Sequence, residues 1–555
     1  MKLAKSLILV VIVLFAFTKC TSKKENTDVA KRPNFIFFLI DDMEKNQFNC
    51  LPEGKGKNLT PNIDKLAEGG TLMMNQYVAS PVCTPSRFNC LTGIYGSRAN
   101  NEEFKREARK NGQTVVQWNT DIIPSDKNTL PRILRRNGYR TGFVGKNHVM
   151  KVKGWKWLPF DTDVSKPEVK EILTKNKKLV QEGFKEMGWD FVESVYYRNP
   201  EMLGPEVLSV HNQDWLTKGG IDFLESQKKE EPFFLYFATT LVHWPTEPKR
   251  SWNANPLATA DGFLDDTLRV QPPRHTIPER IKKAGINGNN SENVLWLDDG
   301  IGAIMKTLEE QGMLENTYVF FLSDHGQEAK GTLYQGGIHN PSIIWHYGGL
   351  KSGKKNYTIV SNIDFAPSIL DLAGIDYSKY PFDGVSFKKV LEGDSSAVHE
   401  SLFFEMGYTR AVIKGDFKYL ALRYPEYALK WTLEERKAKV DSINARRKKR
   451  KQILANPKGD PTKPFSHITL LPGGNTAELS STGKLPGYYD PDQLYNLKTD
   501  PNELHNLAYD PKYKDILEDM KKEMKKYIKS FGDTFPVDRK DKSQLELYKL
   551  RQHKR

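Results

Sequence analysis

Cysteine is scarce in this chain, with only four among 555 residues. That number is too small for a disulfide-rich scaffold or for clusters of cysteine-ligated zinc. No internal repeat is visible, and the balance of 38% hydrophobic and 27% charged residues excludes a disordered chain, a collagen and a multi-span membrane protein. We therefore expect a folded globular protein, built either as roughly two to four domains or as one large α/β domain with an appendage.

The N-terminus carries the features of an export signal. Lysines precede an apolar run of eleven residues at positions 7–17, and polar sequence follows. Because so short a run hardly spans a bilayer, residues 1–20 are predicted to be a signal peptide. Cys20 lies where a bacterial lipoprotein carries its lipid, although Lys19 replaces the small residue that such sites prefer. We expect a bacterial protein that is exported, whether to the periplasm, to the cell surface through a lipid anchor at Cys20, or into the medium.

Negative charge is in deficit. Lys and Arg number 83 against 69 Asp and Glu, which gives a net charge of +14 and suits a polyanionic partner. Six consecutive basic residues occupy positions 446–451 within a stretch predicted to be helical. The export signal and the lack of a binding motif argue against nucleic acid. The basic run is expected to be either a solvated helix face or a patch that attracts an acidic substrate or lipid headgroups.

Short apolar runs alternate with helical patterns along the first 390 residues. Residues 33–43 form an aromatic-rich apolar run that stops at two aspartates, and residues 232–240 form a similar run. Residues 128–146 and 291–326 each indicate a helix, a turn and then a buried strand. This alternation predicts an α/β fold with a large, mostly parallel or mixed sheet between helices.

The pattern changes near residue 390. Shorter, alternating strands from residue 402 onward predict a small antiparallel sheet, and residues 513–532 predict an amphipathic helix. The expected organisation is therefore a signal peptide at 1–20, a tether at 21–31, a large domain at 32–390, a C-terminal α+β subdomain at 391–535 and a tail at 536–555.

Ionisable residues follow several of the predicted strands. In open α/β sheets, ligands bind beyond the carboxyl ends of the strands, so residues at these ends are the candidates for a site. Any one of them is explained by a helix cap or a turn, but their joint occurrence predicts a functional edge. They are Asp41, Asp42, Lys146, His148, His243, Asp324 and His325.

Two neighbouring carboxylates in this set indicate a cation. Asp41 and Asp42 would point to opposite faces of a continuing strand, so both reach one place only if the strand ends and the backbone turns. Carboxylates that meet, with Asp324 as a third, repel one another unless a cation lies between them. Oxygen ligands with one imidazole, His325, suit Ca²⁺ or Mg²⁺ better than zinc.

The segment CTPSRFNCLTG, at residues 83–93, resembles the signature of the type I, formylglycine-dependent sulfatases. All the fixed positions of that signature are present: Cys83, Pro85, Ser86, Arg87, Leu91, Thr92 and Gly93. Other segments resemble the family's metal-binding, sulfate-binding and C-terminal stretches in the same order: residues 35–43, 138–149, 241–245, 323–326, 330–337 and 492–508. The likeness covers roughly residues 32–510 and implies the alkaline-phosphatase-like fold, with residues 32–390 as the catalytic domain.

The resemblance implies that a formylglycine-generating maturation enzyme oxidises Cys83 to an aldehyde. Its hydrated form, a geminal diol, is sulfated on one oxygen and expels sulfate by re-forming the carbonyl, an exit that a sulfated cysteine would lack. Asp324 is then expected to be the base for the attacking hydroxyl. The implied metal is Ca²⁺ in preference to Mg²⁺, held by residue 83 together with Asp41, Asp42, Asp324 and His325.

The resemblance also implies roles for the other charged residues. Arg87 falls on the same helical face as the nucleophile, where it would steady the diol. Lys146 and Lys330 would place positive charge against the sulfuryl oxygens. His243, alone or with Lys330, is expected to protonate the leaving alcohol, and His148 to remove the second proton of the diol.

Two positions depart from the family pattern. Gln335 and His339 stand where many sulfatases have an acid and an arginine, and we expect them to change the packing around the site. The residues that choose the substrate are expected within 99–125, 150–230 and 250–290, where the sequence shows no readable code.

The expected function is hydrolysis of a sulfate ester on a sulfated polysaccharide or oligosaccharide. One alternative is a phosphomonoester or phosphodiester hydrolase of the same superfamily. The other is a catalytically inactive glycan-binding lipoprotein that keeps the Cys83 thiol. Conversion of Cys83 would leave Cys50 and Cys90 as a candidate disulfide pair.

Overall fold

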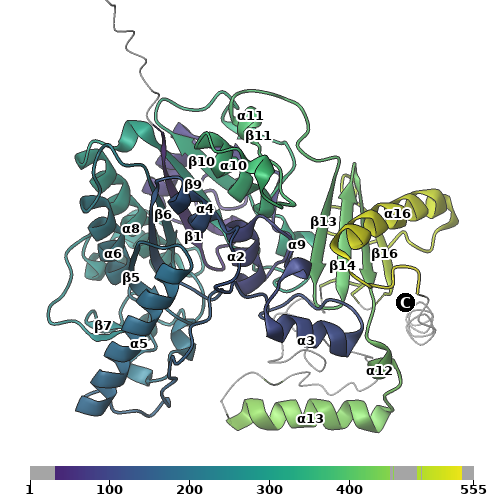
Figure 1. Cartoon of the computed structure of the whole chain (residues 1–555), viewed down its shortest axis with the longest axis horizontal. Coiled ribbons are helices and arrows are strands. Elements are labelled where there is room, and N and C mark those ends of the chain that lie inside the picture. Colours follow the sequence, from purple (N-terminus) through teal and green to yellow (C-terminus); the bar gives the residue numbers. More distant parts are fainter. Residues whose placement is uncertain (1–31, 450–453, 455–483, 489, 540–555) are drawn as a thin grey trace, which may run out of the picture. The chain divides into compact units, whose positions relative to one another are not determined.

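The computed structural model describes residues 32–449, 454, 484–488 and 490–539 (Figure 1). The predicted signal peptide, the tether, Cys20, residues 450–451 of the basic run and most of the predicted tail lie outside these residues. Among the described helices, none is long and apolar enough to cross a membrane.

A large mixed sheet forms the centre of the fold. Its strand order is β11-β2-β10-β9-β1-β6-β4-β5, and only β10 runs antiparallel to its neighbours. The strands span Lys355–Asn356 (β11), Thr71–Met73 (β2), Ser342–His346 (β10), Thr317–Ser323 (β9), Asn34–Ile40 (β1), Phe233–Ala238 (β6), Arg140–Lys146 (β4) and Phe191–Tyr196 (β5). The strands predicted within 33–43, 128–146, 232–240 and 291–326 are confirmed.

Strand β1 shows why these runs are continuously apolar. All its residues are buried, because successive side chains enter two different cores on opposite faces of the sheet. Phe35, Phe37 and Leu39 belong to one core, whereas Ile36 and Phe38 belong to the other. A sheet covered on both faces leaves no place for alternating polar residues.

Helices cover both faces of the sheet (Figure 1). The face of Phe37 is covered by α2 (Cys83–Thr92), α3 (Glu102–Asn111), α4 (Leu130–Arg136), α5 (Pro167–Glu186), α10 (Phe365–Leu372) and α11 (Lys388–Leu391). The face of Phe38 is covered by α1 (Pro61–Gly69), α6 (Gln213–Glu225), α7 (Ile277–Lys283) and α8 (Ser291–Glu310). The predicted α/β arrangement is therefore confirmed.

Short elements fill the connections. They are the paired strands β3 (Gln76–Tyr77) and β12 (Val360–Ser361), the paired strands β7 (Ala258–Thr259) and β8 (Gly262–Phe263), and the helix α9 (Gln335–Ile338). Helices α12 (Glu426–Leu429) and α13 (Leu433–Lys449) follow the second sheet, and α13 includes the first four residues of the basic run at 446–449.

The second sheet is antiparallel, as predicted. It consists of β13 (Ser401–Met406), β14 (Thr409–Lys414), β15 (Phe417–Leu422) and β16 (Asp492–Asn496). Helix α16 (Lys514–Phe531) packs on one face through Leu517, Met520 and Met524. The other face packs against residues 77–82 and 329–338 of the large domain. The expected subdomain boundary at residue 390 remains a prediction.

The candidate disulfide is not formed, because Cys50, Cys83 and Cys90 are all free thiols. Cys90 lies in the core on the Phe37 face of the central sheet. Cys50 packs against the core on the Phe38 face. Since the sheet lies between these cores, the two thiols cannot meet.

Gly145 holds the end of β4 close to β6. Its φ is +98°, and an added Cβ would lie 1.8 Å from the carbonyl oxygen of Ala238. We expect Gly145→Ala to lower the free energy of unfolding by about 3 kcal/mol, because the left-handed backbone and the backbone contact both penalise a side chain. Gly112→Ala is the control, since Gly112 has φ +63° but nothing within 4 Å, and it should cost only about 1 kcal/mol. Equal losses in urea denaturation would show that the contact with Ala238 does not matter.

Candidate active site

The backbone turns directly after β1, as predicted from the paired aspartates. Asp42 has φ +58°, a left-handed conformation that ends the strand. The Asp41 N–H donates to the Leu241 carbonyl at 3.0 Å, and the Asp42 N–H donates to Asp324 Oδ1 at 3.2 Å. The turn therefore fixes the ends of three parallel strands, β1, β6 and β9, against one another.

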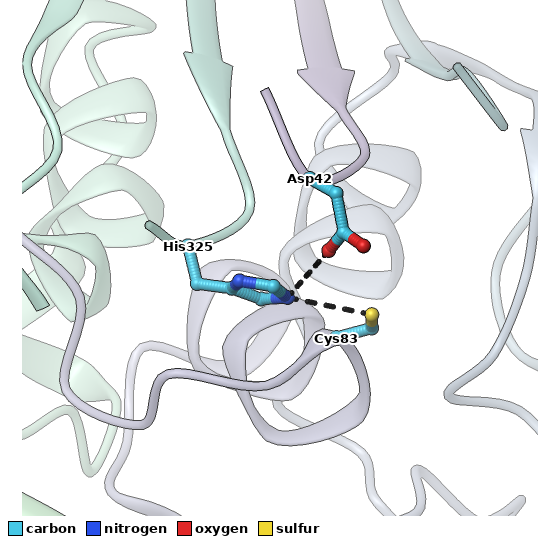
Figure 2. A group of neighbouring side chains, drawn as sticks. All are labelled: Asp42, Cys83 and His325. Carbon is cyan, nitrogen blue, oxygen red and sulfur yellow. Dashed lines mark hydrogen bonds and ion pairs between the residues drawn. The ribbon is translucent and has the colours of Figure 1, made fainter. Parts of the chain in front are cut away.

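Cys83 is the first residue of α2, and all ten residues of that helix are buried. Its Sγ lies 3.5 Å from Asp41 Oδ1 and 3.5 Å from His325 Nε2. Figure 2 shows the imidazole of His325 pointing toward both this sulfur and Asp42, with Nε2 3.2 Å from Asp42 Oδ1. Residue 83 thus contacts the residues that follow both β1 and β9.

The signature residues around Cys83 anchor α2. Ser86 Oγ donates to the Asp324 carbonyl, and Asn362 Nδ2 donates to Ser86 Oγ at 3.0 Å. Gly93 ends the helix in a left-handed conformation, with its N–H donating to the Asn89 carbonyl at 2.8 Å. Small and hydroxyl-bearing residues are needed here because the helix lies wholly inside the protein.

Arg87 lies one helical turn after Cys83 and is completely buried. Its Nη2 contacts Asp41 Oδ1 at 3.3 Å and Asp324 Oδ2 at 3.0 Å. Burial lowers the pKa of Arg87, but Asp324 and Asp41 outweigh burial, so the pKa is raised overall. This guanidinium is therefore a permanent positive charge between two carboxylates.

Two lysines complete the charge balance. Lys146, at the end of β4, bonds Asp41 Oδ2. The Lys330 ammonium donates to both carboxylate oxygens of Asp42, at 2.6 and 2.7 Å. Three buried carboxylates thus have three cationic partners, which is the condition for burying charge at an acceptable cost.

The three carboxylates differ in their protonation. Burial raises the pKa of Asp41, but Lys146 and other cations hold it well below its ordinary value. Burial opposes Lys330 in the same way at Asp42, whose pKa is lowered to about 2. Asp324 has its pKa raised, first by burial and also by the charges of Asp41 and Asp42. Among the three, Asp324 would gain most from a further cation.

The donor set fits a hard divalent cation. Donor atoms of Asp42, Cys83 and His325 lie within 4.8 Å of one another, and so do those of Asp41, Cys83 and Asp324. Carboxylate oxygens with a single imidazole are ligands that Ca²⁺ and Mg²⁺ accept. The two groups share residue 83, so one ion placed between them would also touch the nucleophile's position.

His243 and His148 come from the loops after β6 and β4. His243 Nε2 lies 3.6 Å from Asp42 Oδ2. His148 has φ +57°, and its buried Nδ1 has no hydrogen-bond partner among the described residues. Burial, with help from the charges of Lys146 and Arg87, lowers the pKa of His148 well below its ordinary value. His148 is therefore a neutral imidazole with a free ring nitrogen.

The structure brings the sequence-predicted residues together at one sheet edge. Direct contacts join Asp41, Asp42, Cys83, Arg87, Lys146, His243, Asp324, His325 and Lys330. His148 follows Lys146 by two residues and lies within reach of its charge. The role of each residue stays a prediction.

Sequence reasoning missed the residues that follow β5. Asn199 Nδ2 lies 3.2 Å from His243 Nε2 and donates to Glu201 Oε1 at 3.0 Å. The signal was present, because a polar segment follows the run FVESVYY. That signal is weak, since the run contains Glu193 and Ser194 and is less continuously apolar than the other strands.

Gln335 and His339, the two residues that differ from the family pattern, contact residues outside the charged cluster. The Gln335 N–H donates to Glu503 Oε2 at 2.6 Å. His339 contacts Lys45 Nζ through Nδ1 at 2.8 Å and stacks on Tyr77 with 4.9 Å between ring centroids. Burial, together with Lys45, lowers the pKa of His339 to about 3, so the ring is neutral.

Comparison with known families shows which protein family the chain belongs to. The Sulfatase family model matches residues 33–375, which is more than half of the chain, and the model described as N-sulphoglucosamine sulphohydrolase, C-terminal, matches residues 323–430. The chain belongs to the sulfatase family. It is a sulfuric ester hydrolase, as the signature at Cys83 predicted.

Two relatives show how far the similarity extends. N-acetylgalactosamine-6-sulfatase of Mus musculus is 27% identical over 409 residues, covering 70% of this chain and 71% of that protein. N-acetylglucosamine-6-O-sulfatase of Bacteroides thetaiotaomicron is 24% identical over 473 residues, covering 71% of this chain and 76% of that protein.

Solved sulfatase structures share the fold. BT4656, in complex with its substrate D-glucosamine-2-N,6-O-disulfate, has a TM-score of 0.55 at 18% identity and covers 92% of this chain and 100% of its own. PsFucS1 sulfatase from Pseudoalteromonas sp. has a TM-score of 0.53 at 19% identity and covers 92% of each chain. The predicted alkaline-phosphatase-like fold is confirmed.

The charge balance around Arg87 can be tested by stability. Replacing Arg87 with Met removes the shared partner of Asp41 and Asp324 at similar volume and leaves both carboxylates buried. In the presence of EDTA we expect the free energy of unfolding in urea to fall by about 3–5 kcal/mol. The control is Arg135→Met, because the Arg135 side chain is half-exposed and pairs with the partly exposed Asp190, and it should cost at most about 1 kcal/mol. A loss at Arg87 no larger than at Arg135 would contradict the balance described here.

Proposed function

We propose that this sulfatase hydrolyses sulfate esters on a sulfated polysaccharide or oligosaccharide of the glycosaminoglycan type. The cluster of Cys83, three aspartates and three cationic side chains at the sheet edge carries the proposal, because it offers a nucleophile position with three buried cationic side chains close by. Relatives named for 6-sulfated N-acetylhexosamines and the net charge of +14 support a polyanionic sugar substrate.

An unmodified thiol suits this position poorly. Burial raises the pKa of the Cys83 thiol well above its ordinary value, although Lys146 and Lys330 oppose the shift. Since the thiolate is the nucleophilic form, Cys83 itself would be a weak nucleophile here. Formylglycine, made from Cys83, supplies a hydrated aldehyde whose hydroxyl attacks sulfur and whose carbonyl re-forms to release sulfate.

The cationic side chains bind and orient the sulfate group. Lys146 contacts Asp41 and Lys330 contacts Asp42, and in this proposal both ammonium groups stabilise the charge that the sulfuryl oxygens gain. Arg87 keeps Asp41 and Asp324 in place beside residue 83. Asp324, whose pKa is raised mainly by burial, is the base for the attacking hydroxyl.

His243 and His148 transfer protons in two different steps, release of the alcohol and release of sulfate. His243, on the loop after β6, gives a proton to the leaving alcohol, alone or with Lys330. His148 takes the second proton of the diol when sulfate is eliminated. Its lowered pKa keeps the imidazole neutral, and its Nδ1, which has no hydrogen-bond partner among the described residues, can accept a proton.

A divalent cation bound here, Ca²⁺ in preference to Mg²⁺, would supply positive charge beside the sulfate group and the nucleophile. Asp41, Asp42, Asp324, His325 and residue 83 would hold it. Export, a lipid at Cys20 and the maturation enzyme also belong to this proposal and rest on the sequence alone.

Metal binding should stabilise the folded protein. We expect Ca²⁺ at about a hundredfold excess over its Kd to add about 2.7 kcal/mol to the free energy of unfolding, and Mg²⁺ to add less. Asp42→Asn should abolish this gain. Asp121→Asn, which changes a buried aspartate paired with Lys151 away from the cluster, should keep it. A calcium-dependent rise in melting temperature that is equal in both variants would place the ion elsewhere.

Conversion of Cys83 is tested by peptide mass spectrometry after expression with a maturation enzyme. We expect the peptide to lack the thiol and to react with a hydrazide, and Cys83→Ala to lower sulfate release by about a thousandfold or more. Cys90→Ala, in the same buried helix, is the control and should stay active.

The alternatives give different results in the same assays. An intact thiol in active enzyme would refute the formylglycine mechanism. Faster turnover of aryl phosphate than of aryl sulfate would favour the phosphoesterase alternative. Glycan binding without any sulfate release would favour the inactive lipoprotein.

A further inference from the structure

An exposed tryptophan lies directly beside the predicted proton donor. Trp244 follows His243 on the loop after β6, and 53% of its surface is exposed. By contrast, Trp189 and Trp296 are completely buried. A large aromatic ring left in solvent at the rim of an active site indicates a contact surface for a ligand.

The ring is held in place from one side. The guanidinium carbon of Arg250 lies 5.1 Å from the centroid of the Trp244 ring. Arg250 is itself fixed, because its Nε and Nη2 donate to the Ser209 carbonyl at 3.2 and 2.8 Å. A ring backed by an anchored cation loses little conformational freedom when a ligand stacks on its open side.

A second observation points to a polar ligand at the same imidazole. Asn199 is 6% exposed, and its Oδ1 has no hydrogen-bond partner among the described residues. Glu201 Oε2 is also a buried atom without a hydrogen-bond partner among the described residues, and it lies 4.0 Å from His243 Nδ1. Buried acceptors without donors are costly, and a ligand's hydroxyl or amide hydrogens would satisfy them.

We propose that Trp244, backed by Arg250, stacks against the pyranose ring that carries the leaving oxygen. Asn199 Oδ1 and Glu201 Oε2 accept hydrogen bonds from the hydroxyl or amide groups of that same ring. The inference rests on the proposed function, because His243 must reach the leaving oxygen, and the sugar bearing this oxygen must then lie beside Trp244.

The first test separates sugar binding from sulfate binding. With the sulfated disaccharide that the wild type cleaves fastest, Trp244→Ala should raise KM about tenfold with little change in kcat. Trp244→Phe should restore most of the affinity. Inhibition by inorganic sulfate, which occupies only the sulfate pocket, should be unchanged. Tyr357→Ala, at a site 63% exposed beyond β11, is the control and should behave as wild type.

The second test examines Arg250, which contacts the Trp244 ring, and Glu201, one of the two hydrogen-bond acceptors. Arg250→Ala should raise KM about threefold, and it should add nothing in the Trp244→Ala background, because its effect passes through the ring. Glu201→Gln, which exchanges an acceptor for a donor, should raise KM while sulfate inhibition stays the same.

Two outcomes would overturn the inference. An unchanged KM in Trp244→Ala would show that the sugar does not stack on Trp244. A fall in kcat together with weaker sulfate inhibition would show that Trp244 only supports His243. If the wild type releases no sulfate from any sulfated sugar, the proposed function itself fails, and the proposed sugar stacking on Trp244 fails with it.

Discussion

The structure depends on the burial of three carboxylates in one place. Asp41, Asp42 and Asp324 stand at the ends of neighbouring strands, where their mutual repulsion would open the sheet edge without compensation. Arg87 on α2, Lys146 on β4 and Lys330 on the segment after β9 each reach this cluster from a different element. The charge balance therefore ties α2, which carries Cys83, to the sheet, so the candidate catalytic cluster also helps to hold the fold together.

The small antiparallel sheet belongs to the same support. Its inner face packs against residues 77–82, which precede Cys83, and against residues 329–338, which include Lys330. Behind that contact a buried ion pair joins Lys418 to Glu503, and Glu503 also accepts from the Gln335 N–H. Burial lowers the pKa of Lys418 and raises that of Glu503, so each charge depends on the other. The C-terminal region thus holds the segment that delivers Lys330.

Sequence reasoning succeeded where one physical rule dominates. The continuously apolar runs of β1, β6 and β9 identify buried parallel strands, and the polar residues after them meet because parallel strands end at one edge. It failed where sidedness matters, since Cys50 and Cys90 are separated by a sheet whose two faces the sequence does not label. It also passed over Asn199, because β5 is an edge strand whose Glu193 breaks the apolar pattern.

Strand-end topology also explains why chemistry and substrate recognition share one loop. The Val242 N–H donates to the Asp41 carbonyl, which fixes the loop after β6 to the turn at Asp41 and Asp42. The backbone that carries His243 and Trp244 is therefore anchored next to the cluster. A sugar placed against the ring would bring its oxygen to the imidazole of His243, the predicted proton donor, whereas a sugar that misses the ring would also miss His243. Stacking on Trp244 would then hold the sugar equally in the bound substrate and in the transition state, so it would raise the affinity for substrate and leave the rate of the chemical step nearly unchanged.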